Sequence, residues 1–138
     1  MTIAPERRPD WRERLRTYVL SNLSVPFRPG QHDCALFVAG AVREMTGHDF
    51  GKGWRGKYRS IKAGEALAQE RGYDDHEAIF SRHLDPVEPS FARVGDVAAV
   101  ETEAGTALGI VQGEAVYVLH VGGMAIVPRE QMTRAYRV

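Results

Sequence analysis

The sequence predicts an α+β domain in which N-terminal helices pack on a C-terminal antiparallel β-sheet. Two observations support this fold class. Apolar residues recur at helical spacing in the first part of the chain, whereas short apolar runs separated by glycines fill the part after Gly95. Helices that come first and strands that come last are typical of α+β architecture. The chain has the length of one domain and no internal repeat, so we expect a single domain over 1–138 with a flexible leader at 1–9.

The first expected helix begins at Trp11 and reaches about Leu23. Its apolar residues follow helical spacing, and Asp10 with Glu13 form a variant capping box. Prolines and a glycine at 26–30 then interrupt the pattern. A second helix is expected to start at Asp33 and to end at Gly47, which puts Cys34 in its first turn.

Two further helices are expected before the sheet. Ser60 is a candidate N-cap for a helix that ends near Arg71, with Gly72 after it, and a shorter helix is expected over 75–83. Pro86 and Pro89 indicate an extended connector. The strands are expected at 97–100, 107–111, 115–121, 124–127 and 134–138, with a turn or one helical turn at 128–132.

Composition and charge exclude several classes of protein. Apolar residues make up 43% and charged residues 26%, which is ordinary for a folded globular domain. The 18 basic and 18 acidic side chains cancel, so we expect no nucleic-acid partner. Residues 43–62 carry six basic side chains against two acidic, and residues 65–103 carry ten acidic against three basic. We therefore expect a charge-polarised molecule, either as solvated faces or as docking surfaces.

The lone cysteine, Cys34, cannot form an internal disulfide and favours synthesis in a reducing compartment. No signal-peptide pattern and no run of roughly 18 apolar residues is present, so no membrane insertion is expected. The sequence has neither paired cysteines nor a histidine pair at metal-binding spacing, and no glycine-rich phosphate loop. We expect no metal and no cofactor.

Cys34 is the candidate nucleophile because a helix N-terminus stabilises a thiolate. The alternative is a small buried apolar residue. A thiol nucleophile needs a base, normally histidine. Of the five histidines, His120 is the only one that a strand supplies, whereas His76 and His83 are expected to be exposed in the short helical stretch.

The order of the motifs resembles the NlpC-like, papain-fold peptidases of cell-wall peptides. The motifs are His-Asp-Cys-Ala-Leu-Phe at 32–37, Val-Gly-Asp-Val at 94–97 and Leu-Gly-Ile-Val at 108–111, followed by a strand that ends at His120. The chain is also similar to short proteins of phage, prophage and gene-transfer-agent tail modules, with Gly-Lys-Tyr-Arg at 56–59 as a second signature. The resemblance implies a papain-like fold and a catalytic set of Cys34, His120 and Asp33. It also implies a place in the virion tail, synthesis in the cytoplasm of a bacterial host, and other tail or hub subunits as partners.

One departure from this pattern concerns the general base. The position where the peptidase pattern has its catalytic histidine is Ala107 here, and alanine cannot accept a proton. The first hypothesis is therefore a tail-tip or hub protein with a structural or assembly role and a degenerate active site. The second is an active cysteine peptidase that cleaves peptidoglycan peptides, with Cys34 as nucleophile and His120 as base. A third is a cytoplasmic binding module unrelated to phage.

Overall fold

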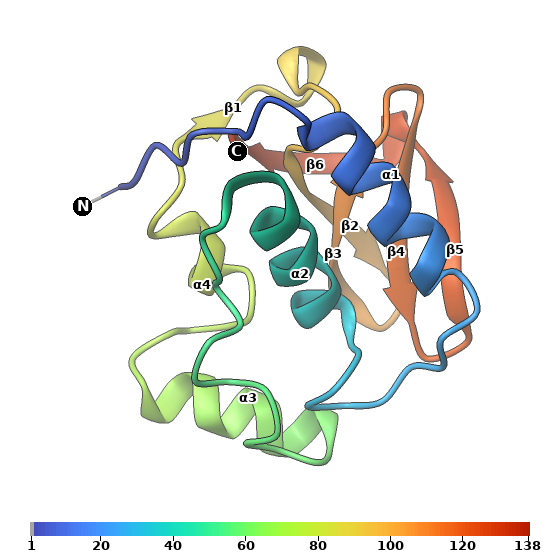
Figure 1. The fold of residues 1–138 in the computed structure, drawn as a ribbon. Helices are drawn as coiled ribbons and strands as arrows, with labels where there is room; N and C mark the ends of the chain where they lie inside the picture. The colour runs from blue at the N-terminus through green and yellow to red at the C-terminus, as the bar shows by residue number, and fades with distance from the viewer. Residues whose placement is uncertain (1) are drawn as a thin grey trace.

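A computed structural model describes residues 2–138 and has the expected α+β arrangement, with helices first and strands last. The helices are α1 (Trp11–Asn22), α2 (Cys34–Thr46), α3 (Ile61–Glu70) and the one-turn α4 (Ala78–Ser81). In Figure 1, α1 and α2 lie against the sheet, whereas α3 lies at the end of α2, away from the strands. The layout leaves the start of α2 between α3 and the sheet.

The strands of the described chain form one antiparallel sheet in the order β1-β6-β2-β3-β4-β5. Their bounds are β1 (Pro86–Val87), β2 (Val97–Thr102), β3 (Gly105–Val111), β4 (Ala115–His120), β5 (Gly123–Pro128) and β6 (Met132–Tyr136). Strands β2 to β5 form a meander in which each strand pairs with the next, and β6 returns to pair with β2. Single 3₁₀ turns occupy Pro89–Phe91 and Arg129–Gln131.

Apolar side chains on both faces of the sheet are buried. On one face, residues of α2 such as Phe37 and Val38 share a cluster with Leu108, Ile110 and Leu119 of the sheet. The other face carries a second, smaller cluster, made mostly of valines and alanines. Its buried members are Ala92, Ala98, Val100, Val111, Val116, Val118, Met132 and Ala135. Successive residues of a strand point to opposite faces, which explains why β2, β3 and β4 contribute to both clusters.

A glycine lets α1 and α2 approach closely. The Tyr18 hydroxyl donates a hydrogen bond to the Phe37 carbonyl at 2.8 Å, and the Tyr18 ring stacks on the Phe37 ring at 5.5 Å. A Cβ atom at Gly40 would lie 2.1 Å from the Tyr18 hydroxyl oxygen. The contact therefore needs glycine at position 40, and it fixes α1 against the helix that begins at Cys34.

Two local expectations are wrong. Asp10 precedes α1 but makes no side-chain cap, because its carboxylate accepts a hydrogen bond from Arg14 instead. The leader is attached to the body of the molecule, although we expected it to be loose. Arg7 donates hydrogen bonds to the carbonyls of Val138 and Val94 and to the carboxylate of Asp96. Only residues 2–9 of the leader can be compared, since Met1 lies outside the described residues.

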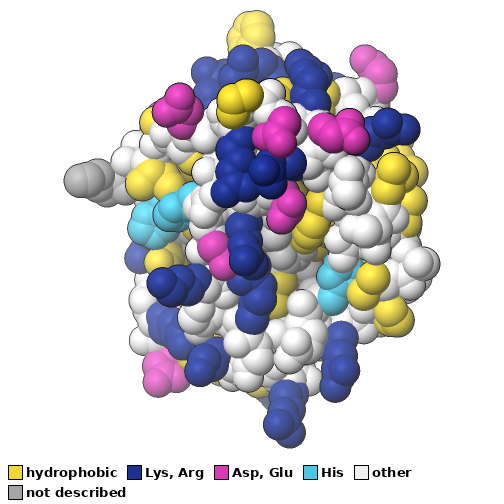
Figure 2. All heavy atoms as spheres, in the orientation of Figure 1, with side chains coloured by type: hydrophobic (Ala, Val, Ile, Leu, Met, Phe, Trp, Pro, Cys, Tyr) yellow, Lys and Arg dark blue, Asp and Glu magenta, His cyan; other side chains and the backbone are white. Residues whose placement is uncertain are grey.

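Arginines from other parts of the chain form ion pairs with three carboxylates of the acidic segment. Arg7 pairs with Asp96 at 3.1 Å, and Arg134 of β6 pairs with both Glu77 and Glu101. Figure 2 shows basic and acidic side chains close together on the upper part of the face in view, whereas basic side chains predominate lower down, around α3. On the face in view, the polarity of the sequence persists as a basic region around α3.

Candidate functional site

Cys34 is the first residue of α2, as the sequence predicts. Its side chain is half-buried. The amide groups of the first turn have no acceptor within a helix, and the peptide dipoles point their positive end at this position. A thiolate at Cys34 is stabilised by both effects. The nucleophile predicted from the sequence is thus in a position that suits the chemistry.

Asp33 caps α2 and does not face a reacting group. One of its carboxylate oxygens accepts hydrogen bonds from the Gly30 amide at 3.0 Å and the Tyr58 hydroxyl at 2.6 Å, and the other accepts from the Leu36 amide at 3.0 Å. Asp33 is buried. Its carboxylate therefore holds the helix start in place, which gives it a positioning role beside Cys34.

The loop that links α2 to α3, over residues 47–60, is anchored at the start of α2. Gly30 has a φ of 81°, and a Cβ atom there would lie 1.9 Å from the Tyr58 carbonyl oxygen. Burial, together with the hydrogen bond to Asp33 and the charge of its carboxylate, raises the pKa of Tyr58, so its hydroxyl stays protonated as a donor. Trp54 packs on Tyr73, and Arg55 forms an ion pair with Asp49. These contacts give the loop an anchoring role.

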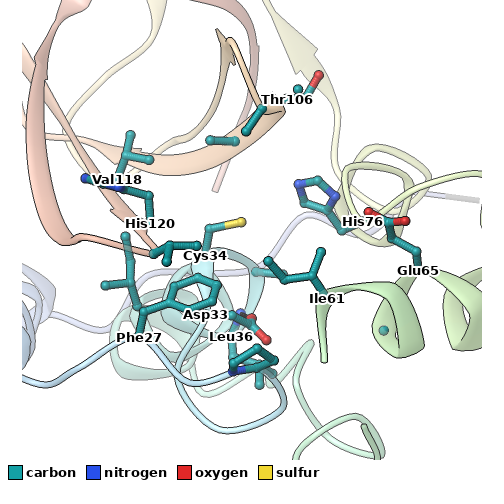
Figure 3. A pocket seen from close by; sticks show the side chains of 18 of the residues that line it. Phe27, Asp33, Cys34, Leu36, Ile61, Glu65, His76, Thr106, Val118 and His120 are labelled. Carbon is teal, nitrogen blue, oxygen red and sulfur yellow. Dashed lines mark hydrogen bonds between the residues drawn. The ribbon is translucent and has the colours of Figure 1, made fainter. Parts of the chain in front are cut away.

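His76 supplies the imidazole that faces Cys34, and the expectation that it is exposed is wrong. It lies in the turn that precedes α4, and its Nε2 atom is buried. Figure 3 shows Cys34 between His76 on one side and His120 on the other, with Thr106 next to His76. The turn before α4 thus brings an imidazole next to the thiol of Cys34.

The pKa of His76 reflects this pairing. Burial lowers the pKa, but pairing with Cys34 and the charge of Asp75 outweigh burial, and the Thr106 backbone adds to them, so the pKa is raised to about 9. With a pKa raised in this way, the imidazole of His76 is protonated near neutral pH. Nε2 of His76 makes no hydrogen bond of normal geometry within residues 2–138. Such contacts often tighten only when substrate binds.

Thr106 precedes Ala107, where the peptidase pattern has its histidine. The Thr106 backbone contributes to the pKa of His76, and both residues line the same cavity as Cys34. The imidazole of His76 therefore occupies the neighbourhood of position 107, although it comes from another part of the chain. The cavity that contains position 107 therefore has an imidazole in it, although residue 107 itself is alanine.

Glu77 attaches the His76 turn to the sheet. Its carboxylate accepts hydrogen bonds from Arg134 at 2.7 and 3.0 Å and from the Tyr136 hydroxyl. Burial raises the pKa of Glu77, but the hydrogen bonds from Arg134 and Tyr136 outweigh burial and lower it. Glu77 is buried. The residue next to the base is thus fixed to β6 by an ionised carboxylate.

His120 is at the end of β4, as expected, and it lines the cavity on the other side of Cys34. Its side chain is exposed, and its Nδ1 accepts a hydrogen bond from the Gly122 amide at 3.2 Å. The Gly122 amide fixes the ring orientation locally. His120 is therefore a rim residue, and the raised pKa and the pairing with Cys34 belong to His76.

The remaining histidines have other surroundings. His83 shares a hydrogen bond of 3.1 Å with the Tyr73 hydroxyl, and His48 packs edge-on against Phe50. His32 contacts the edge of Phe37, and burial lowers its pKa. None of these three lines the cavity that contains Cys34.

A cavity of about 610 Å³ opens at the thiol. Aromatic and aliphatic side chains from the helical side form one wall, and side chains of β2 to β5 form the other. Cys34, His76, Thr106 and His120 are among its few polar residues. A large apolar cavity with a few convergent polar groups is the usual form of a small-molecule or substrate site.

Residues 2–138 contain no cluster of three or more side chains suited to a metal ion. Across the same residues, no helix is both long enough and apolar enough to span a bilayer.

A comparison with protein families matches residues 6–138 to a family described as a domain of unknown function, DUF6950. The chain belongs to the DUF6950 family. No curated protein matches it. Cys34, His76 and Thr106 all lie within the matched range, so the paired thiol and imidazole are part of the DUF6950 domain itself.

Proposed function

We propose that the protein is a thiol hydrolase of amide bonds, with Cys34 as nucleophile and His76 as general base and acid. The observation that carries this proposal is that His76 and Cys34 face each other in one cavity (Figure 3), and the neighbouring Cys34 raises the pKa of the imidazole to about 9. A thiolate is the reactive form of cysteine, and an adjacent imidazolium stabilises it.

The reaction proceeds in two steps. The Cys34 thiolate attacks the carbonyl carbon, a C–S bond forms, the C–N bond breaks, and His76 gives its proton to the leaving amine. Water then attacks the thioester carbon while His76 takes a proton from it, a C–O bond forms and the C–S bond breaks, and the products are a carboxylic acid and the Cys34 thiolate beside protonated His76. First-turn amides of α2 are suited to bind the negative oxygen of each tetrahedral intermediate.

The substrate and the biological setting come from the resemblance to NlpC-like peptidases. A helix-borne thiol packed beside an antiparallel sheet is the arrangement that a papain-like fold would have. The expected substrate is therefore a peptidoglycan peptide, and the expected setting is the tail tip of a phage-type particle, next to other tail or hub subunits.

A structural tail-tip protein without activity is the other candidate. The reason for it in the sequence is Ala107, which lacks a proton acceptor. That reason weakens because His76 reaches the same neighbourhood. We therefore place the hydrolase first, although the two candidates share the same expected setting.

Incubation with purified peptidoglycan fragments, followed by mass spectrometry of the products, distinguishes the two. We expect cleavage by the wild type, none by Cys34→Ala, and a loss of roughly a hundredfold or more in His76→Ala, because a positioned base contributes about that much. His120→Ala is the matched histidine control and should keep most of the activity. Cleavage that needs His120 and not His76 would contradict the assignment of the base, and no cleavage by the wild type would favour the structural role.

A further inference from the structure

We propose that the cavity beside Cys34 binds a neutral, apolar acyl group, so that among amide substrates, peptides included, the preferred one carries an uncharged, apolar group on the acyl side of the bond that is cut. The inference rests on the proposed function, because the acyl group in question is the one that becomes a thioester on Cys34.

The walls of the cavity are apolar on both sides of the thiol. Phe27, Phe50 and Trp54 line it from the helical side. Val118 of β4 and Ala125 of β5, which pair across the two strands, line it from the sheet. Such walls favour a hydrocarbon group, since each buried methylene contributes about 0.8 kcal/mol.

Exposed apolar side chains extend this surface to the rim. Ile61 at the start of α3 is 51% exposed and Val121, after β4, is 71% exposed, and both line the cavity. Large apolar side chains grouped at the mouth of a cavity indicate a surface that a ligand covers. An acyl chain that reaches the rim would remove both from water.

The charges of the site disfavour an acidic acyl group. Among the described residues, no lysine or arginine lines the cavity. The Asp33 carboxylate is occupied by its three donors, and Glu65 and Glu103 are exposed lining residues. A substrate carboxylate would lose its hydration without gaining a lysine or arginine partner, the protonated His76 already faces Cys34, and the carboxylate would meet two like charges.

Acylation by p-nitrophenyl esters tests the inference directly. The Cys34 thiolate attacks the ester carbonyl, a C–S bond forms, the C–O bond breaks, and p-nitrophenolate leaves with the electron pair. We expect the acylation rate to rise about fourfold per methylene from acetate to hexanoate, which corresponds to about 0.8 kcal/mol each. The mono-adipate ester has the same chain length with a terminal carboxylate, and it should react at least about tenfold more slowly than hexanoate. Equal rates for the two esters, or a faster adipate, would overturn the inference.

Two substitutions on β5 locate the acyl group. Ala125 lines the cavity, whereas its neighbour Ile126 does not line it and is 63% exposed. Ala125→Phe should abolish the preference for hexanoate over acetate, and Ile126→Phe should leave it intact. The same loss in both variants would contradict the placement of the chain.

A binding measurement separates this inference from the proposed function. Hexanamide and adipamic acid are compared as protectants of Cys34 against iodoacetamide, which requires no turnover. Protection by hexanamide alone, without hydrolysis of any substrate, would support the apolar site and contradict the hydrolase. Hydrolysis without a chain-length preference, and equal protection by both compounds, would support the hydrolase and contradict the apolar site.

Discussion

The carboxylate of Asp33, next to Cys34, caps helix α2. Asp33 accepts the amide of Leu36 in the first turn of α2, the amide of Gly30 and the hydroxyl of Tyr58. A sequence motif that places Asp beside Cys suggests an acid or an orienting group, but this geometry uses the acid for capping.

Substitution of Asp33 should therefore lower stability more than substitution of its partner. We expect Asp33→Ala to cost about 1–3 kcal/mol of unfolding free energy, because three donors lose their acceptor. Tyr58→Phe removes one donor and leaves two, so about 1 kcal/mol or less is expected. Urea denaturation measures both. An Asp33→Ala protein as stable as the wild type would contradict the capping role.

At the residue scale, the sequence predicted the position of Cys34 at a helix start and missed that His76 faces it. Cys34 follows from local information, since a cap and a helix start are adjacent in the chain. His76 depends on where its turn runs, and that path is fixed by Glu77 and Arg134, which are 57 residues apart. The only signal in the sequence was that Glu77 follows His76. This signal is weak unless it is known that Arg134 pairs with Glu77.

At the scale of elements, the ion pair between Glu77, before α4, and Arg134 of β6 orients the neighbouring His76. The Glu77 carboxylate accepts hydrogen bonds from Arg134 and from the Tyr136 hydroxyl. Its neighbour His76 lies beside Thr106 and Cys34. Glu77 acts through His76 and is a positioning residue.

Glu77→Gln should lower the iodoacetamide reactivity of Cys34 at pH 7 by a few-fold or more, because the imidazole is less well held. Glu101→Gln is a matched control, since Glu101 also pairs with Arg134 but is exposed and far from His76 in the chain. The pH profile of the rate, recorded for both variants, separates a shifted pairing from general destabilisation. An unchanged profile in Glu77→Gln would contradict the role.

The junction before α2 depends on one glycine. Gly30→Ala combines a positive φ with a Cβ atom that would lie 1.9 Å from a backbone oxygen of Tyr58. Gly113 also has a positive φ, but nothing lies within 4 Å of a Cβ atom there. We expect Gly113→Ala to cost about 1–2 kcal/mol from the backbone alone, and Gly30→Ala to cost clearly more. Thermal unfolding measures both variants. Equal losses of unfolding free energy would contradict an added cost from the close contact with Tyr58.

Most elements followed from capping and periodicity, and the exceptions have physical reasons. Ser60 caps α3 through the Ala63 amide, and Gly47 ends α2 in the left-handed conformation, as predicted. Asp10 failed as a cap because Arg14 competes for its carboxylate. Attachment of the leader could not be foreseen, because Arg7 meets residues from the last third of the chain.

At the scale of the whole molecule, carboxylates that accept hydrogen bonds link folding to pH. Burial raises the pKa of Glu77 and of Asp49, but hydrogen bonds from Arg134 and Tyr136 to Glu77, and from Arg55 and the Gly51 amide to Asp49, lower both on balance. A carboxyl whose folded pKa is depressed contributes stability above its unfolded pKa and loses it as the pH falls through the folded value.

The unfolding free energy should therefore fall as the pH drops below about 4.5, the ordinary range of a glutamate. Glu77→Gln should lose less stability between pH 6 and pH 3 than the wild type, because one linked group is removed. Urea denaturation across this range measures the difference. Parallel pH dependence of the two proteins would contradict the link to Glu77.

Three distant parts of the chain meet at the site: the start of α2, the turn before α4 and the β2–β3 hairpin. The proposed activation of Cys34 by His76 depends on the start of α2 and the turn before α4. Iodoacetamide, which alkylates Cys34, can test the effect of both His76 and His120.

The most direct test is the pH dependence of Cys34 alkylation by iodoacetamide in the wild type, His76→Ala and His120→Ala. We predict that the wild type and His120→Ala react alike, and that His76→Ala reacts roughly tenfold more slowly at pH 7, with its half-maximal rate at a higher pH. Identical profiles for the wild type and His76→Ala would contradict the account.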